Sequence, residues 1–155
     1  MTVDLTEEKF RTQLTVRLRE GESLLGVPLP GACTFTSGNG VEILWMGPDE
    51  YLVLAEPGRQ AELEAALSRE CDAVVDVSAQ RNVYRLTGSH AADVLAHGCS
   101  IDLEVSPPGT CVQTLFARTG IVLMVREDCY TILVRQSFSD YFRVWLADAS
   151  LEYVP

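Results

Sequence analysis

The fold is decided by residues 74–103, which read VVDVSAQRNVYRLTGSHAADVLAHGCSIDL. Val74, Val75 and Val77 are β-branched, and such residues favour the pleated, half-buried surface of a strand. A second strand-forming run follows over residues 83–87 and ends at Gly88. This half of the stretch therefore predicts two strands joined by a short turn.

A short helix is predicted to follow the second strand, over residues 90–97. Ser89 precedes it, and a serine in this position commonly accepts a hydrogen bond from a free N–H of the first turn. Gly98 follows it and suits the left-handed conformation in which many helices end. The stretch thus reads strand, strand, helix, and we take residues 73–103 as a central segment.

The chain on either side of this central segment contains an internal repeat. A shift of 79 residues places Asp49 on Asp128 and Tyr51 on Tyr130. The same shift matches apolar positions through both strands and the helix: Leu44 with Leu123, Leu54 with Leu133, Leu63 with Phe142, and Leu67 with Leu146. We interpret the two segments as related β-β-α units over residues 32–70 and 111–149.

Helices are predicted at the end of each of these units. Residues 59–70 carry leucines at helical spacing with charges opposite them, and residues 137–149 carry the clearest apolar stripe of the chain. Ser137 with Asp140 three residues later resembles a capping box. Together with strands in meander order, this pattern predicts an α+β fold with mostly antiparallel sheets and about three helices.

Composition indicates one globular domain over residues 1–155. Apolar residues make up 47% of the chain and charged residues 22%, which is typical of folded proteins. The net charge of −10 argues against nucleic acid or an anionic membrane as partner, because both select for basic surfaces. The first twelve residues lack the apolar run of a signal peptide, so we expect a cytoplasmic location.

Candidate metal ligands and nucleophiles are sparse. The five cysteines are widely spaced and form no C-x-x-C pair, so we expect small buried thiols rather than disulfides or a zinc site. His90 and His97 are seven residues apart, too far on a rigid helix to share a metal. His97 and Cys99 could offer two ligands at a helix end, but zinc needs four. We expect no metal site.

No catalytic or cofactor-binding motif is present either. The sequence has no G-x-G-x-x-G, no phosphate-binding P-loop and no G-x-S-x-G. Asp76 interrupts an apolar strand, and its carboxylate could bind a ligand amine or a pterin ring. A charge pair with Arg81 or Arg85 across the hairpin is the interpretation we favour, because an unpaired buried carboxylate is costly. We therefore assign no catalytic and no cofactor-binding residue.

Several short motifs carry a family resemblance. They are VVDVS at 74–78, Arg81, RLTG at 85–88, HA at 90–91, VL at 94–95, GC at 98–99, DL at 102–103, LGVPLP at 25–30, LWMGPDEYLVL at 44–54, PPGTCVQTL at 107–115 and LVRQSFSDY at 133–141. In order and spacing they resemble the gamma subunits of heterotetrameric sarcosine oxidase, from about Thr12 onward.

The resemblance implies a fold similar to the aminomethyltransferase domain of the glycine-cleavage T-protein, built from duplicated ferredoxin-like halves. It also implies a non-catalytic accessory role in a complex that oxidatively demethylates sarcosine or a related N-methyl amine. FAD, FMN, NAD and folate would then reside on alpha and beta subunits and zinc on the delta subunit. We expect this chain alone to bind no cofactor. Its expected partners are the alpha- and beta-like flavoprotein subunits, with delta as a further candidate.

One departure from the family concerns the first half of the chain. Related gamma subunits carry a helix between the first strand and the LGVPLP segment. Here only residues 19–23 separate a strand over 10–18 from residues 24–31. The shortening points to altered partner contacts or to a complex that acts on another N-methyl substrate.

A partner-binding surface is expected on large strand side chains, because alternation cannot bury all of them at once. Loop and strand-end residues of the family motifs would form its polar rim, although the two prolines could equally just shape turns. The predicted interface residues are Trp45, Tyr51, Arg81, Tyr84, Pro107, Pro108 and Gln113.

Three functions stay open from the sequence. The first is a subunit of a sarcosine-oxidase-like complex. The second is a stand-alone folate-binding or folate-dependent methyltransferase-like protein, which would need an acid in a deep pocket around Asp76. The third is a regulatory scaffold module without a redox partner.

Overall fold

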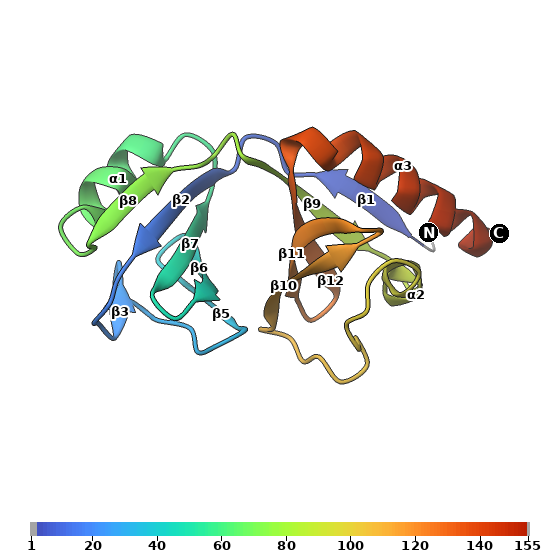
Figure 1. Cartoon of the computed structure of the whole chain (residues 1–155), viewed down its shortest axis with the longest axis horizontal. Helices are drawn as coiled ribbons and strands as arrows, with labels where there is room; N and C mark the ends of the chain where they lie inside the picture. The colour runs from blue at the N-terminus through green and yellow to red at the C-terminus, as the bar shows by residue number, and fades with distance from the viewer. Residues whose placement is uncertain (1–2, 155) are drawn as a thin grey trace. The chain divides into compact units, whose positions relative to one another are not determined.

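A computed structural model describes residues 3–154 and has the α+β architecture expected, with antiparallel sheets and three α-helices in this part of the chain (Figure 1). The strands are β1 (Asp4–Glu7), β2 (Thr12–Arg17), β3 (Ser23–Leu24), β4 (Val27–Pro28), β5 (Phe35–Gly38), β6 (Val41–Gly47), β7 (Glu50–Ala55), β8 (Ala73–Asp76), β9 (Arg81–Thr87), β10 (Cys111–Phe116), β11 (Thr119–Val125) and β12 (Cys129–Arg135). The helices are α1 (Gln60–Leu67), α2 (Ala91–Ala96) and α3 (Ser139–Ser150), with 3₁₀ turns η1 (Gln136–Phe138) and η2 (Leu151–Tyr153).

The described residues divide into two compact units. Unit 2 comprises residues 9–80, and unit 1 comprises residues 3–8 together with 81–154. Each unit has its own hydrophobic core. The single domain expected over residues 1–155 stays a prediction. No helix of the described chain is long and apolar enough to cross a membrane.

Unit 2 is a five-stranded sheet in the order β5-β6-β7-β2-β8 with α1 packed against it. Leu14 and Val16 on β2 lie directly opposite Val53 and Tyr51 on β7. These side chains and α1's Leu63 and Leu67 form the core, because the strands and the helix each turn one apolar face inward. A β3–β4 hairpin occupies the connection between β2 and β5.

Unit 1 is a five-stranded sheet in the order β1-β9-β12-β11-β10 that carries α2 and α3. The N-terminal strand β1 pairs antiparallel with β9 and so closes one edge of this sheet. Tyr84 of β9, Phe116 of β10 and Phe142 of α3 meet in the core, with ring centroids 5.4 Å apart for Tyr84 and Phe142 and 5.3 Å for Phe116 and Phe142. Aromatic packing of this kind joins helix and sheet.

The strand register differs by one residue between the two segments related by the 79-residue shift. Leu44 lies opposite Leu52, and in the matching position of unit 1 Met124, not Leu123, lies opposite Thr131. The cause is an irregularity of β6 between Trp45 and Gly47, which adds one residue before the turn. A single extra residue reverses the face on which every side chain of a strand lies.

The predicted ends of two helices are also wrong. His90, not Ser89, occupies the N-cap of α2, and Phe138, not Ser137, occupies that of α3, with no side-chain cap in either case. Gly98 does not have the positive φ of a left-handed backbone conformation. A Cβ at Gly98 would lie 3.0 Å from the backbone nitrogen of Ala117 and 3.0 Å from the Phe116 ring. The glycine is needed for close packing against β10 and its turn, and not for ending the helix.

Candidate partner-binding surface

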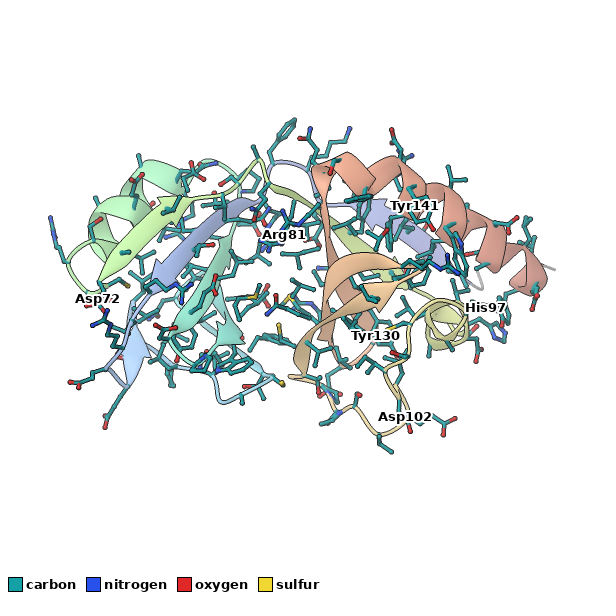
Figure 2. All side chains as sticks on the ribbon, viewed as in Figure 1. Asp72, Arg81, His97, Asp102, Tyr130 and Tyr141 are labelled. Carbon is teal, nitrogen blue, oxygen red and sulfur yellow. The ribbon has the colours of Figure 1, made fainter. Side chains whose placement is uncertain are left out.

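A hollow of about 340 Å³ lies on the sheet of unit 1. Its wall and floor come from strands β9, β10, β11 and β12, and the lining residues are Arg81, Gln113, Thr114, Leu115, Gly120, Ile121, Val122 and Arg135. Two of the seven residues predicted as interface, Arg81 and Gln113, therefore meet here although they are far apart in sequence. Figure 2 labels Arg81, at the start of β9.

The strand register explains the shape of this hollow. Arg81 on β9 lies directly opposite Arg135 on β12. On β11, Ile121 pairs with Val134 of β12, so Gly120, the residue before Ile121, lies beside Arg135. On its other side, Gly120 lies opposite Leu115 of β10. A glycine between an arginine and a leucine leaves a gap in the row of side chains. We call these four residues, with Gln113, the Gly120 hollow.

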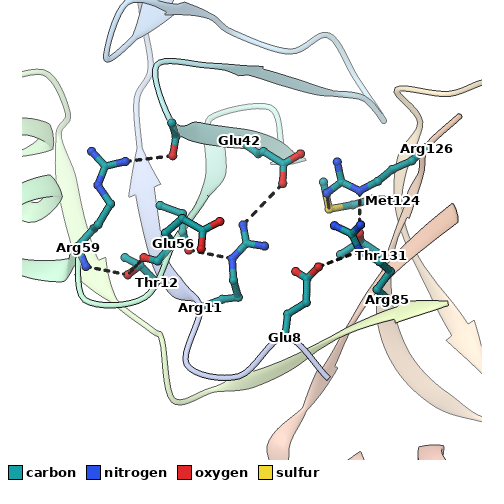
Figure 3. Close-up of polar contacts among 12 residues, drawn as sticks. Glu8, Arg11, Thr12, Glu42, Glu56, Arg59, Arg85, Met124, Arg126 and Thr131 are labelled. Atoms are coloured by element: carbon teal, nitrogen blue, oxygen red, sulfur yellow. Dashed lines mark hydrogen bonds and ion pairs between the residues drawn. The ribbon is translucent and has the colours of Figure 1, made fainter. Parts of the chain in front are cut away.

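The Gly120 hollow has positive character in an acidic chain. Two arginines line it, and no Asp or Glu occurs among its described lining residues. Elsewhere in the described chain, Arg85 Nε lies 3.0 Å from Glu8, and Arg11 Nη2 lies 3.8 Å from Glu42 (Figure 3). Arg59 Nη2 lies 2.8 Å from Glu62.

The aromatic residues predicted as interface lie elsewhere. Tyr51 and Tyr84 are 7% and 2% exposed and belong to the cores of units 2 and 1. Trp45 is half-buried and packs against the core of unit 2. The expectation that alternation leaves such side chains uncovered is wrong for the two tyrosines, because each lies on the core side of its sheet. Their role at an interface stays a prediction without support from exposure.

Pro107 and Pro108 lie exposed in the loop between α2 and β10. The carbonyl oxygen of Pro107 accepts hydrogen bonds from the backbone N–H and the hydroxyl of Thr110. This closes a turn in which Gly109 has a φ of +96°. The local geometry therefore gives Pro107 a turn-shaping role, and an interface role of either proline stays a prediction.

The two histidines meet at the C-terminal turn. His90 Nδ1 lies 2.7 Å from Asp93, and the His90 ring stacks on Tyr153 with centroids 4.9 Å apart. His97 Nε2 lies 3.1 Å from the Tyr153 hydroxyl and 3.7 Å from Glu152. These contacts attach the 3₁₀ turn η2 to α2, whose end carries the His97 labelled in Figure 2. No set of three or more potential metal ligands is found among the described residues.

Asp76 was predicted to pair with an arginine, and the structure gives its carboxylate a different partner. It is exposed, and its carboxylate accepts hydrogen bonds from the backbone N–H and the hydroxyl of Ser78, at 3.0 and 2.6 Å. Arg85, one of the two candidate partners, donates to Glu8. The Asp76 carboxylate thus finds its hydrogen-bond donors two residues further along the chain, in an Asx turn at the end of β8.

The expectation of buried thiols holds for Cys99, Cys111 and Cys129, whereas Cys33 is exposed and Cys71 is half-buried. Burial, helped by the charges of Glu70 and Asp72, raises the pKa of the Cys71 thiol to about 11. Burial also raises the pKa of Cys129. A raised pKa keeps a thiol protonated and weakens it as a nucleophile.

Comparison with known proteins decides the family. Residues 20–152 match the model of the sarcosine oxidase, gamma subunit family. The chain is 36% identical to the sarcosine oxidase subunit gamma of Corynebacterium sp. (strain P-1), over 98% of this chain and 82% of that protein. The chain belongs to the sarcosine oxidase gamma subunit family. The corresponding Arthrobacter protein is 34% identical to this family member, with 97% and 81% covered.

Solved structures agree with this assignment. The heterotetrameric sarcosine oxidase from Corynebacterium sp. U-96, in complex with pyrrole 2-carboxylate, contains a chain that matches this gamma-family protein with a TM-score of 0.83. That match has 33% identity and covers 97% of this chain and 85% of the other. The glycine cleavage system aminomethyltransferase T from Bartonella henselae matches with a TM-score of 0.64 at 14% identity, over 94% of this chain and 45% of that one. The expected likeness to the aminomethyltransferase fold is thus confirmed.

Proposed function

We propose that this chain is a non-catalytic accessory subunit of a sarcosine-oxidase-like complex that oxidatively demethylates sarcosine or a related N-methyl amine. The observation that carries the proposal is similarity along nearly the whole chain to a component of a heterotetrameric sarcosine oxidase. Alpha- and beta-like flavoprotein subunits would be its direct partners. FAD, FMN, NAD, folate and zinc would be held by the other subunits.

The side chains support an accessory role. His90 and His97, which flank the two ends of α2, contact Asp93, Tyr153 and Glu152 and no cysteine or serine nucleophile in these contacts. The cysteines with shifted pKa values are shifted upward, away from the thiolate. Asp76 lies in an exposed turn, so it does not supply the deep acidic pocket that a folate-dependent methyltransferase would need.

We also infer that units 1 and 2 are duplicated modules of the ferredoxin-like kind. The strand order β9-β12-β11-β10 in unit 1 corresponds to β2-β7-β6-β5 in unit 2. In matching positions, Tyr84 lies opposite Ile132 and Leu14 lies opposite Val53. Each copy lends its first strand to the other: β1 precedes β2 in sequence but pairs with β9, and β8 precedes β9 but pairs with β2.

Co-expression with the alpha- and beta-like flavoprotein genes tests the proposed function. Native mass spectrometry of the purified assembly should show this chain in a fixed ratio to the flavoprotein subunits. Amine-dependent oxygen consumption should require the flavoprotein subunits and be absent from this chain alone. The proposal is wrong if the chain stays monomeric while the other subunits assemble and oxidise their amine at full rate.

A further inference from the structure

Phe10, in the short connection between β1 and β2, combines two unfavourable features. Its side chain is 83% exposed, more than any other large apolar side chain of the described residues, although such side chains gain free energy by leaving water. Its φ of +60° lies in the left-handed region, which a bulky residue rarely adopts. A backbone conformation of this kind persists only where the surrounding structure imposes it, and it is often found at functional sites.

The residues on either side of this position are held by hydrogen bonds. The backbone N–H of Glu8 donates to the carbonyl oxygen of Val83 at 2.8 Å, within unit 1. Arg11 Nε donates to the carbonyl oxygen of Ala55 at 2.9 Å, within unit 2. The chain thus presents Phe10 from a backbone that is fixed before and after it. A surface prepared in this way loses little conformational entropy when another protein binds it.

Lys9 adds a positive charge next to the exposed ring. It is the single lysine of the sequence and is exposed, and no hydrogen bond or ion pair to another described residue involves its side chain. A phenyl ring followed by an ammonium group fits a protein surface that has an apolar pocket and a carboxylate at its rim. A second copy of this chain is a poor occupant, because two molecules with a net charge of −10 repel each other.

We propose that Phe10 is an anchor residue that inserts into an apolar pocket of a partner subunit, where Lys9 pairs with an Asp or Glu at the rim of the pocket. Burial of the ring in that pocket recovers the free energy that its exposure costs the separate chain. This inference rests on the proposed function, because the partner that it assigns is a flavoprotein subunit of the complex.

The variant Phe10→Asn tests the anchor, because asparagine tolerates the left-handed conformation and lacks the ring. Dilution of co-expressed complexes, followed by native mass spectrometry, should show association with the flavoprotein subunits weakened at least about thirtyfold. Phe138→Asn is the matched control. Phe138 is 49% exposed and occupies the N-cap of α3, where asparagine is favoured, so this variant should associate within about twofold of the wild type.

Two further measurements distinguish an anchor from a structural residue. The unfolding temperature of the separate Phe10→Asn chain should equal or exceed that of the wild type, because the exposed ring contributes little packing and asparagine relieves backbone strain. Phe10→Leu should recover most of the association, since leucine keeps an apolar side chain. Leu25 has a φ of +52°, so a leucine already adopts this backbone conformation elsewhere in the chain.

A chemical cross-link identifies the partner group. A carbodiimide joins an amine directly to a carboxylate, and Lys9 supplies the one lysine amine of this chain. In the wild-type complex the reagent should join Lys9 to an Asp or Glu of a flavoprotein subunit, which peptide mass spectrometry can locate. Lys9→Arg keeps the charge, so it should assemble normally and lose this product.

The outcomes separate the two proposals. If the wild-type chain assembles and Phe10→Asn associates as tightly as Phe138→Asn, Phe10 is not an anchor and the proposed function stands. Weaker association together with a lower unfolding temperature of the separate Phe10→Asn chain would also overturn the inference, because Phe10 would then support the fold. A Lys9 cross-link found only between copies of this chain would overturn it as well. If the wild-type chain does not assemble at all, both proposals fall.

Discussion

The side-chain hydroxyls of Tyr84 and Ser139 are hydrogen-bonded to each other inside the core of unit 1, joining β9 to α3. Ser139 also accepts a hydrogen bond of 3.0 Å from the side-chain amide of Asn82. A tyrosine hydroxyl buried among apolar side chains needs such a partner, because an unpaired polar group in a core is costly. Tyr84, which was predicted to lie at a partner surface, is thus part of the contact between α3 and the sheet of unit 1.

Tyr84→Phe should lower the free energy of unfolding by about 1 kcal/mol, since it removes one buried hydrogen bond and keeps the ring packing. Urea denaturation measures the change. Tyr130→Phe is the matched control and should change stability by less than about 0.5 kcal/mol, because Tyr130 is only half-buried on the neighbouring strand. If Tyr84→Phe weakened assembly with the flavoprotein subunits and left stability unchanged, Tyr84 would be an interface residue after all.

Gly98→Ala and Gly120→Ala should change stability in opposite directions. At Gly98 the new methyl group would press on Ala117 and Phe116, and overpacking of this kind costs about 1–3 kcal/mol. At Gly120 it would meet open space, and the loss of unfolded-state freedom should raise stability by about 0.4–1 kcal/mol. Thermal or urea unfolding of the two variants checks this. Equal effects would contradict the packing described for either glycine.

Deleting residues 2–7 should destabilise unit 1 selectively. β1 pairs with β9 over Asp4–Glu7, and Leu5 packs against the unit 1 core. Each lost backbone hydrogen bond costs about 1 kcal/mol, so amide exchange in β9 should become faster by at least about tenfold. Amides of β2 and β7 in unit 2 serve as the internal control and should keep their protection. Uniform loss of protection in both units would show that they unfold together.

Alkaline pH should destabilise the protein through Cys71. Its folded-state pKa of about 11 lies above the ordinary value of 9.0, so folding favours the protonated thiol. The contribution of the protonated Cys71 thiol to the free energy of unfolding is complete below pH 9 and is lost as the pH rises from 9 towards 11. Cys71→Ser should therefore flatten the fall in stability over this range, as measured by urea midpoints at stepped pH. Cys33→Ser is the control, because Cys33 is exposed, and should leave the slope unchanged.

Thiol labelling makes a related prediction at neutral pH. An alkylating reagent should modify Cys33 first, because it is exposed whereas Cys99, Cys111 and Cys129 are buried. Peptide mass spectrometry after short reaction times identifies the modified site. Rapid labelling of Cys129 would contradict both its burial and its raised pKa.

The sequence by itself determined the elements and the family. Runs rich in β-branched residues specify strands locally, and apolar residues at helical spacing, Leu63 with Leu67 in α1 and Phe142 with Leu146 in α3, specify helices. The α+β class with antiparallel sheets followed from the order of these elements. The family motifs are linear, so their order and spacing could be read without coordinates. Helix ends were less predictable: Ser89 and Ser137 have suitable chemistry, but the chain begins each helix one residue later.

Only the tertiary structure decided which residues share a surface. The meeting of Arg81, Gly120 and Arg135 depends on the pairing of β9 with β12, because α2, β10 and β11 lie between these two strands in the sequence. Tyr51 and Tyr84 lie in the cores of units 2 and 1. Alternation along a strand shows that successive side chains lie on opposite faces of the sheet, but it does not show which face a helix covers. Strand register is set by these non-local contacts, and a one-residue irregularity at Trp45–Gly47 was enough to move Leu44 out of the predicted correspondence.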